Sequence, residues 1–275
     1  LCTGTLIDTD VVLTARHCVS RTTEEVQCPG STPQITSDRS ANTLAIYVGD
    51  DIAHAELVAR GKHLIVPKGN MLCGDDMALI VLDREVAGIT PLNVRKTALA
   101  SGDHVRAVGY GKRGDEEPAG TKLLREHVKV LSVTRTEFQV GEATCQGDSG
   151  GPALDETSGE VVGVVSRGGP ACEGSDVHNI YTRTDAFLTL IAQAKAMGGA
   201  SGDGDAGKGA SHKPPKPTSD IGSACTKSTD CPSGVCVSSS GKQYCSQTCG
   251  TGDRCPNHYH CGKASSGASV CIQQP

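Results

Sequence analysis

The sequence predicts an all-β protein, a sandwich or a barrel, followed by a closing helix and a small disulfide-rich module. Through residues 1–197, short apolar runs of strand length alternate with Gly, Pro, Asp or Asn. Glycine is abundant, at 34 of 275 residues, which suits a chain with many tight turns. Eight of the 14 cysteines fall after residue 222, which marks a separate cross-linked module.

The expected strands are mainly aliphatic, because Trp is absent and Phe and Tyr are few. Their rhythm favours a sandwich or a barrel over βαβ units. The clearest runs lie at residues 11–13, 44–48, 77–82, 105–108, 128–133 and 161–165.

Residues 185–197 break this rhythm and predict a helix at the end of the main domain. Thr184 or Asp185 would be its N-cap. Apolar side chains recur there at helical spacing, at Phe187, Leu188, Ile191 and Ala194.

The composition changes after residue 197. Residues 198–222 are rich in Gly, Ser, Ala and Asp and contain a proline-rich stretch, so they predict a flexible tether. Residues 223–275 hold a tandem cysteine repeat with too few large apolar residues for a core, so we expect disulfides to staple it. Zinc is less favoured, because no C-x-x-C pair occurs. The connectivity stays open for the eight cysteines, Cys225, Cys231, Cys236, Cys245, Cys249, Cys255, Cys261 and Cys271.

Charge and hydropathy exclude some classes of protein. The net charge is −5 with acids and bases interspersed, so the basic footprint of a nucleic-acid-binding protein is missing. No apolar run reaches the roughly 18 residues of a membrane span. The cysteine content predicts an oxidising compartment and hence secretion. No signal peptide is visible, and the chain opens inside an expected strand at residues 1–6, so we expect an N-terminal portion to be missing.

Three segments carry residues suited to nucleophilic catalysis, in the order His, Asp, Ser. They lie at residues 13–18, 75–79 and 145–152 and contain His17, Asp76 and Ser149. A serine hydroxyl attacks a peptide carbonyl only if a base such as histidine removes its proton. A buried carboxylate then orients the imidazole, and backbone N–H groups beside glycines stabilise the oxyanion.

Each of these residues also has a more ordinary interpretation. Taken singly, His17 would be a surface or core histidine, Asp76 a turn residue and Ser149 part of a glycine-rich loop. Their combination in these contexts favours catalysis.

The three segments resemble those of the trypsin/chymotrypsin family, over nearly all of residues 1–197. The resemblance implies two Greek-key β-barrels with the site at their seam. It implies that His17 is the general base, Ser149 the nucleophile and Asp76 the residue that orients His17. Gly147 and Ser149 would donate backbone N–H groups to the oxyanion.

The resemblance extends to two supporting residues. Ser166 resembles the family's serine that supports the triad aspartate, and we also expect it among the residues that contact the substrate. Asp148 resembles the aspartate that pairs with the new N-terminal ammonium after zymogen cleavage. Because that N-terminus is not in the sequence, the chain as written could be inactive although the full-length enzyme is not.

Three disulfides are expected in the main domain. Two match family bridges that brace the histidine loop and close the specificity pocket, and the third joins, by exclusion, the two cysteines that remain. These pairs are Cys2–Cys18, Cys145–Cys172 and Cys28–Cys73.

The specificity pocket departs from family members that select Arg or Lys. Its base position is Ala143, beside Thr144, where those enzymes have an aspartate, so a cationic side chain would lack an ion partner. Gly168 matches an open pocket wall, whereas Asn179 stands where glycine is common and would narrow the pocket or make it polar. We therefore predict cleavage after small or medium uncharged residues.

Three charged residues leave alternatives open. Glu142 and Glu173 lie near the pocket in sequence and could restore a cationic preference. Arg167 stands where the family usually has Trp. It could favour acidic or polar residues upstream of the cut, or face solvent without effect.

Two functions from different classes are consistent with this pattern. One is an active secreted endopeptidase, expected to be a monomer, that acts on protein or peptide substrates. The other is a protease-like binding protein with a decayed site, against which the intact candidate residues argue.

The cysteine-rich module would bind a cell surface, matrix or glycan, or act as a spacer. No cofactor or metal is expected, calcium included, because the acids at residues 50–51 do not match the family's calcium loop.

Overall fold

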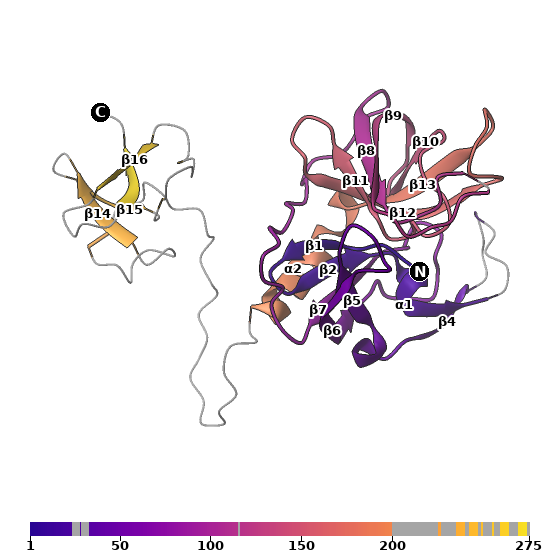
Figure 1. Ribbon diagram of the computed structural model, residues 1–275, viewed down its shortest axis with the longest axis horizontal. Coiled ribbons are helices and arrows are strands. Elements are labelled where there is room, and N and C mark those ends of the chain that lie inside the picture. The colour runs from indigo at the N-terminus through magenta and orange to yellow at the C-terminus, as the bar shows by residue number, and fades with distance from the viewer. Residues whose placement is uncertain are drawn as a thin grey trace. The chain divides into compact units, whose positions relative to one another are not determined.

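The computed structural model divides into two compact units, Leu1–Asp205 and Ala206–Pro275 (Figure 1). In the first unit it describes residues 1–23, 28, 33–114 and 116–199. In the second unit it describes residues 225–226, 235–239, 242–246, 249, 255, 259–263 and 269–273. Residues 200–222 of the predicted tether lie outside the described residues, so the proposed domain boundaries stay predictions.

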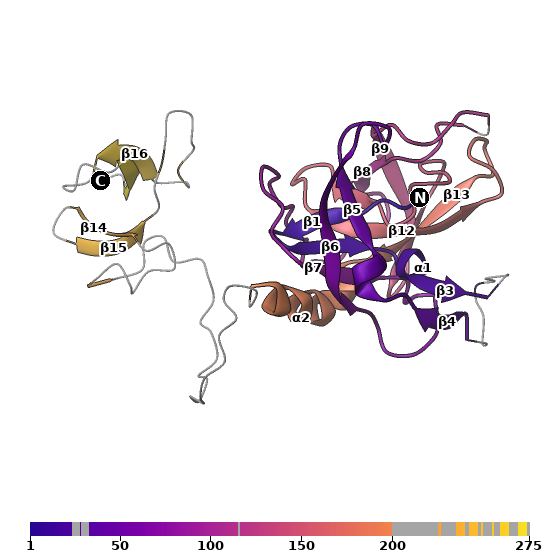
Figure 2. The same cartoon turned by 60° about the horizontal axis from the view of Figure 1, so that its bottom comes forward.

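An antiparallel sheet of five strands forms the N-terminal half of the first unit, in the order β1-β2-β7-β6-β5. Its central strands, β2 and β7, are buried along their whole length. Helix α2 (Leu188–Gly198) packs against these two strands (Figure 2), which explains their nearly continuous apolar pattern. The strands are β1 (Thr5–Asp8), β2 (Val11–Thr14), β5 (Ala45–Val48), β6 (Glu56–Ile65) and β7 (Ala78–Leu82).

Short elements connect β2 to β5. The single-turn helix α1 (Arg16–Val19) follows β2 almost directly, and β3 pairs with β4 in a two-stranded sheet. The remaining elements of this connection are β3 (Ser20–Thr22), β4 (Ile35–Asp38) and the 3-10 helix η1 (Ala41–Thr43).

A closed barrel of six antiparallel strands forms the C-terminal half of the first unit, in the order β10-β13-β12-β11-β8-β9. Pairing of β10 with β9 closes it. Its strands are β8 (His104–Gly109), β9 (Leu123–Val133), β10 (Glu137–Val140), β11 (Pro152–Asp155), β12 (Val161–Gly169) and β13 (His178–Arg183).

The barrel core is built around two aromatic rings. Phe138 on β10 and Tyr181 on β13 are buried and stacked, with ring centroids 5.0 Å apart. Gly163 on β12 lies under the Phe138 ring, where a Cβ would stand 2.4 Å from Phe138 Cε1. The rest of the core is aliphatic, as the composition predicts.

The all-β prediction with a closing helix is confirmed, and two details differ. Only the second barrel is closed. The N-terminal sheet is a half-barrel, because its edge strands β1 and β5 form no ladder with each other among the described residues, and a barrel needs paired edges. The helical region begins with the 3-10 turn η2 (Asp185–Phe187). Thr184 does not cap it, because its hydroxyl donates to the Val161 carbonyl instead, at 3.0 Å.

The described part of the second unit contains two hairpins that match the tandem cysteine repeat. Strand β14 (Val235–Ser239) pairs with β15 (Lys242–Ser246), and β16 (Tyr259–Lys263) pairs with β17 (Ser269–Gln273). In each hairpin, two cysteines lie opposite each other on the paired strands. They are Cys236 and Cys245 in the first hairpin, and Cys261 and Cys271 at the corresponding positions of the second. The disulfides described here are Cys225–Cys236, Cys249–Cys261 and Cys255–Cys271.

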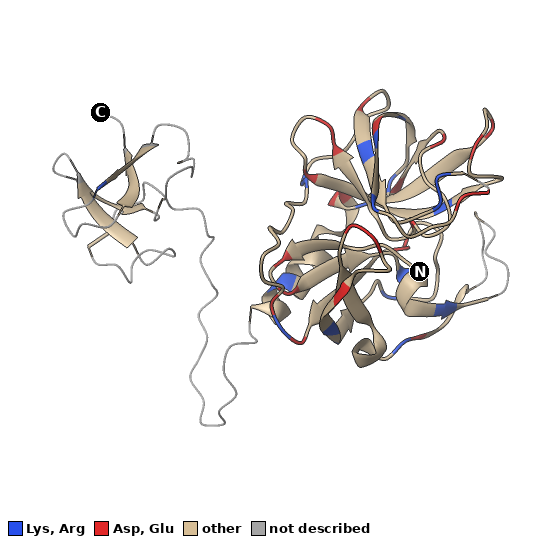
Figure 3. Ribbon diagram, in the orientation of Figure 1, with Lys and Arg blue, Asp and Glu red and all other residues tan. Residues whose placement is uncertain are grey.

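Charged residues of both signs are scattered over the first unit (Figure 3). Several form local ion pairs, such as Arg183 with Asp185 and Arg95 with Asp155. Within the described residues, no helix is long and apolar enough to span a membrane.

Replacing the buried ring in Phe138→Ala is expected to lower the free energy of unfolding by about 3–5 kcal/mol, because a cavity replaces the stacked ring. Leu131→Ala is the control, since Leu131 is exposed on the same barrel and its loss should change stability by only about 0.5 kcal/mol. Denaturant unfolding of both variants measures the difference. Equal effects would contradict the packing described for the barrel core.

Candidate active site

A buried carboxylate and an imidazole lie together at the end of the N-terminal sheet. Asp76 is 2% exposed, and its Oδ2 atom lies 2.8 Å from His17 Nδ1. Its Oδ1 atom accepts the backbone N–H of His17 at 2.9 Å. The two contacts from one residue hold the imidazole plane and leave its second nitrogen, Nε2, directed away from Asp76.

The register of two strands explains why these residues meet. Thr14 at the end of β2 is opposite Ala78 at the start of β7. His17 lies three residues after Thr14, and Asp76 lies two residues before Ala78, so both leave the sheet at the same edge. Sequence positions 59 residues apart are thereby brought within hydrogen-bonding distance.

Ser166 connects the barrel to this pair. It lies on β12, is buried, and donates its hydroxyl to Asp76 Oδ2 at 2.7 Å. Its side chain is engaged there, and Ser166 does not line the cavity beside Ser149, so the expected contact of Ser166 with substrate stays a prediction.

Ser149 lies in a tight loop in which the neighbouring glycines are needed, because a side chain at their positions would clash with nearby atoms. Gly150 has φ +82°, and a Cβ on it would lie 2.2 Å from Thr14 Oγ1. The Ser149 carbonyl accepts the N–H of Thr3 at 2.8 Å, while the Thr3 carbonyl accepts the Thr14 hydroxyl at 2.8 Å. Thr3, which sequence reasoning missed, therefore ties the serine loop to the strand that leads into His17.

The imidazole and the Ser149 hydroxyl are not hydrogen-bonded to each other in this structure, although both residues are described. The Nε2 atom of His17 lies 3.8 Å from Cys18 Sγ. Both side chains are partly exposed, so they are accessible from solvent. Hydrogen bonds of this kind are often long without substrate and tighten in the complex.

Two backbone N–H groups beside the serine are free to donate. Neither the Gly147 nor the Ser149 N–H has an acceptor among the residues that the structure describes. Gly147 has φ +105°, and a Cβ on it would stand 2.9 Å from Gly111 Cα, so only glycine fits this turn. Its carbonyl accepts the Thr3 hydroxyl at 3.0 Å, which fixes the orientation of the loop.

Asp148, between these donors, points into the barrel side of the loop. Its two oxygens accept the N–H groups of Gly111 at 2.8 Å and Cys145 at 2.9 Å. Burial raises the pKa of the Asp148 carboxyl, although those two N–H groups and the charge of Arg125 act in the opposite direction. No cation lies within ion-pair distance of it in the described part of the chain. Its pairing with an N-terminal ammonium stays a prediction.

A cavity of about 210 Å³ lies beside Ser149 and is lined by Thr144, Gly168 and Asn179, among others. Asn179 is 2% exposed, and its Oδ1 atom accepts the N–H groups of Ala143 at 2.8 Å and Thr144 at 3.0 Å. Its Nδ2 atom lies against Gly168, where a Cβ would clash with it. The amide of Asn179 therefore fills the space that Gly168 leaves open.

Ala143, the expected base of the pocket, does not line this cavity. It lines a neighbouring cavity of about 270 Å³ on the Asp148 side. The residue that lines the cavity beside Ser149 is instead Asn179, whose amide oxygen accepts the Ala143 N–H.

The charged residues near the cavity are paired with each other. Arg167 binds Glu137 through two hydrogen bonds, at 2.6 and 2.9 Å, and both expectations for Arg167, an effect on residues upstream of the cut or none, stay predictions. Glu142 binds Arg125 at 2.7 Å and accepts the Gly174 N–H at 3.0 Å, and these partners lower the pKa of its carboxyl. Sequence reasoning missed Glu137, because its partner lies 30 residues away.

Disulfides brace the loops around the site. The structure contains all three bridges that were expected in this unit. They join helix α1, which carries His17, to the segment before β1, the 145 loop to the 172 loop, and residue 28 to the loop before Asp76. The bridges are Cys2–Cys18, Cys145–Cys172 and Cys28–Cys73.

Comparison with known proteins agrees with this geometry. The profile of the Trypsin family matches residues 1–191, which is well over half of the chain. The chain belongs to the trypsin family. This membership and its relatives identify it as a serine endopeptidase of the trypsin type.

Three relatives illustrate the similarity, and each match covers 70% of this chain. A trypsin-like protease of Streptomyces glaucescens is 29% identical over 214 residues, with 74% of its length matched. Snake venom serine protease 3 of Protobothrops jerdonii is 26% identical over 226 residues, with 78% matched. Protein masquerade of Drosophila melanogaster is 26% identical over 229 residues, and the match spans only 20% of that longer protein.

Solved structures show the same fold. Neuropsin, a serine protease expressed in the limbic system of mouse brain, superposes with a TM-score of 0.53 and 21% identity, over 70% of this chain and 88% of that one. A Glu endopeptidase superposes with a TM-score of 0.53 and 22% identity, over 71% and 85%. Together with the family match, they confirm the chymotrypsin-like fold.

The buried Asp148 carboxyl should make stability depend on pH. Because the folded protein holds the Asp148 proton more tightly than the unfolded chain, its contribution is fully present below a pH of about 4 and is lost as the pH rises through the raised pKa. The free energy of unfolding of the native protein minus that of Asp148→Asn should therefore fall over this window and level off above it. Denaturant unfolding at a series of pH values measures it, and a difference independent of pH would contradict the prediction.

Proposed function

We propose that this trypsin-family enzyme is a secreted endopeptidase in which Ser149 is the nucleophile, His17 the general base and Asp76 the residue that orients His17. The observation that carries the proposal is the hydrogen-bonded chain from Ser166 through Asp76 to His17, beside a serine loop whose turns are made by Gly147 and Gly150 at positive φ. Secretion is supported by the disulfides of both units, since such bonds persist in oxidising compartments.

In the proposed reaction, Ser149 Oγ attacks the substrate carbonyl while its proton moves to His17 Nε2. Asp76 accepts the Nδ1–H of His17, so it selects the tautomer whose Nε2 atom is free to take that proton. His17 then returns the proton to the leaving amine as the C–N bond breaks, which leaves an ester on Ser149. Water attacks this ester with His17 again as base, and the acid is released.

The N–H groups of Gly147 and Ser149 would stabilise the negative charge that forms on the substrate oxygen. They are suited to this role because they are free of other acceptors in the described chain and belong to a loop that Thr3 and Asp148 hold in place. Donors held in position before the reaction lower its barrier by about 3 kcal/mol each.

The proposed specificity is for small or medium uncharged side chains at the residue before the cut. The amide of Asn179 occupies the pocket space beside Gly168 and offers no negative charge to a cation. Glu142 cannot supply that charge freely, because its carboxylate is already bonded to Arg125 and the Gly174 N–H. A substrate cation would therefore lose its hydration without gaining a partner.

A binding protein without catalysis is the second candidate. It is favoured by the absence of a hydrogen bond between His17 Nε2 and Ser149, and by the lack of a cation beside Asp148 among the described residues.

The cysteine-rich module is proposed to bind a surface or glycan ligand, whichever of the two candidates holds. Its two described hairpins, with their disulfides, offer a stable unit for such a ligand.

Labelling with a fluorophosphonate probe separates the two candidates. The native protein in its active form should be labelled at Ser149 and should hydrolyse peptides, whereas Ser149→Ala should lose labelling and nearly all hydrolysis, on the order of 10⁶-fold in kcat. The control is Ser132→Ala, because Ser132 is an exposed serine on β9 and should leave both unchanged. Mass spectrometry of the labelled peptide identifies the site. Absence of labelling in the native protein would favour the binding protein.

Opening the pocket in Asn179→Gly should shift the cleavage preference towards larger uncharged side chains. Removing the amide clears the space beside Gly168, so the ratio of kcat/KM for a large to a small side chain should rise by roughly 10-fold, the effect of one or two methylene groups in a pocket. The ratio is measured within one preparation, so it is independent of the folded fraction. An unchanged ratio would show that Asn179 does not set the preference.

A further inference from the structure

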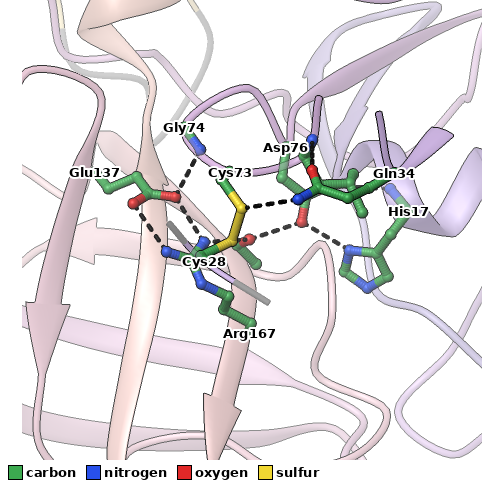
Figure 4. Close-up of a disulfide and its surroundings, with 10 residues drawn as sticks. His17, Cys28, Gln34, Cys73, Gly74, Asp76, Glu137 and Arg167 are labelled. Carbon is green, nitrogen blue, oxygen red and sulfur yellow. Dashed lines mark hydrogen bonds and ion pairs between the residues drawn. A yellow bond between two sulfur atoms is a disulfide. The ribbon is translucent and has the colours of Figure 1, made fainter. Parts of the chain in front are cut away.

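Glu137 at the start of β10 joins two segments that lead to the candidate active site (Figure 4). Its Oε1 atom accepts the backbone N–H of Gly74 at 2.9 Å and Arg167 Nη1 at 2.6 Å. Its Oε2 atom accepts Arg167 Nη2 at 2.9 Å. The carboxylate is only 16% exposed, so these three bonds are shielded from much of the competition of water.

The first segment is the loop that carries Asp76. Gly74 lies two residues before Asp76, has φ +84°, and a Cβ on it would stand 2.9 Å from Thr136 Oγ1. The loop therefore runs close to the barrel at this point, and Glu137 binds its backbone there. On its other side, the Cys28–Cys73 disulfide and a 3.3 Å contact from Gln34 Nε2 to Cys73 Sγ hold the loop (Figure 4).

The second segment is the end of β12. Arg167 Nη1, which Glu137 binds, also lies 3.4 Å from Ser166 Oγ. Ser166 in turn donates to Asp76 Oδ2 at 2.7 Å. Both branches from Glu137 thus end at Asp76, one through the backbone of its loop and one through the side chains of Arg167 and Ser166.

A purely stabilising role for Glu137 does not explain why its bonds lead to both segments that place Asp76. A partly exposed ion pair contributes little to the free energy of unfolding on average. The Arg95–Asp155 pair has similar exposure, 23% and 14% against 30% and 16% for Arg167–Glu137. It lies at the far end of β11, and no chain of side-chain hydrogen bonds through the described residues connects it to Asp76. Glu137 differs from it by binding both segments that place Asp76.

We propose that Glu137 is a positioning residue that holds Asp76, and through it His17, in the geometry needed for catalysis. The inference rests on the proposed peptidase function of this site. Glu137 touches neither substrate nor the reacting atoms, and it acts by fixing the Asp76 loop of the N-terminal sheet to the barrel that carries Ser166. Glu137 binds both Nη atoms of Arg167 and thereby keeps the Arg167 guanidinium in place beside Ser166.

The test compares steady-state kinetics of the native enzyme with Glu137→Gln and Glu137→Ala in the full chain. Glu137→Ala removes both branches and should lower kcat by roughly 10-fold to 100-fold with KM nearly unchanged, because the misplaced Asp76 acts on the transition state. Glu137→Gln keeps an acceptor for the Gly74 N–H and should lose less. The rate of fluorophosphonate labelling at Ser149 should fall in parallel with kcat.

Asp155→Asn is the matched control, because it breaks the comparable ion pair away from the site. It should change the unfolding temperature at least as much as Glu137→Gln and leave kcat at the native value. Native kcat and native labelling rates in Glu137→Gln would overturn the proposal, and this variant decides the matter if Glu137→Ala fails to fold. If the native enzyme itself is not labelled at Ser149, the proposed function fails instead, so the two failures are distinguishable.

Discussion

The buried carboxylate of Asp76 is the group on which the rest of the site depends. It accepts three hydrogen bonds, two from His17 and one from Ser166, and it has almost no contact with water. A carboxylate buried without such donors would cost more free energy than a folded domain can absorb. Because the donors come from both halves of the unit, Asp76 is stable only when the N-terminal sheet and the barrel have docked. Folding and assembly of the site are therefore one event.

The seam between the two halves is built to keep that geometry. Val161 and Val164 of β12 belong to the same buried cluster as the apolar residues of β2 and β7. Thr3 adds polar contacts across the seam, since it binds the Ser149 loop and Thr14 together. Apolar packing supplies most of the docking free energy, whereas the polar contacts select the register in which His17 and Ser149 approach each other.

The two units differ in what stabilises them, buried apolar side chains in the first and disulfides in the second. The first unit has large buried clusters, and its three disulfides lie in loops around the site. Among its described residues, the second unit has two small buried clusters, one around Cys225 and Cys245 and one around Val237, Tyr244 and Val270, so we expect its disulfides to carry much of its stability. Reducing conditions should accordingly affect the second unit's fold more directly, because little apolar burial would remain to replace the cross-links.

The sequence by itself determined the all-β class, the closing helix, the cysteine repeat and the identity of the candidate triad, because strand periodicity and short motifs are local properties of the chain. It could not determine that Asn179 would bind the Ala143 N–H beside the cavity, that Arg167 would pair with Glu137, or that Thr3 would tie the serine loop to Thr14. Most of those contacts join residues 30 or more positions apart in the sequence. Only the tertiary structure decided them, because the partner of a polar group is set by which strands pack together and in which register.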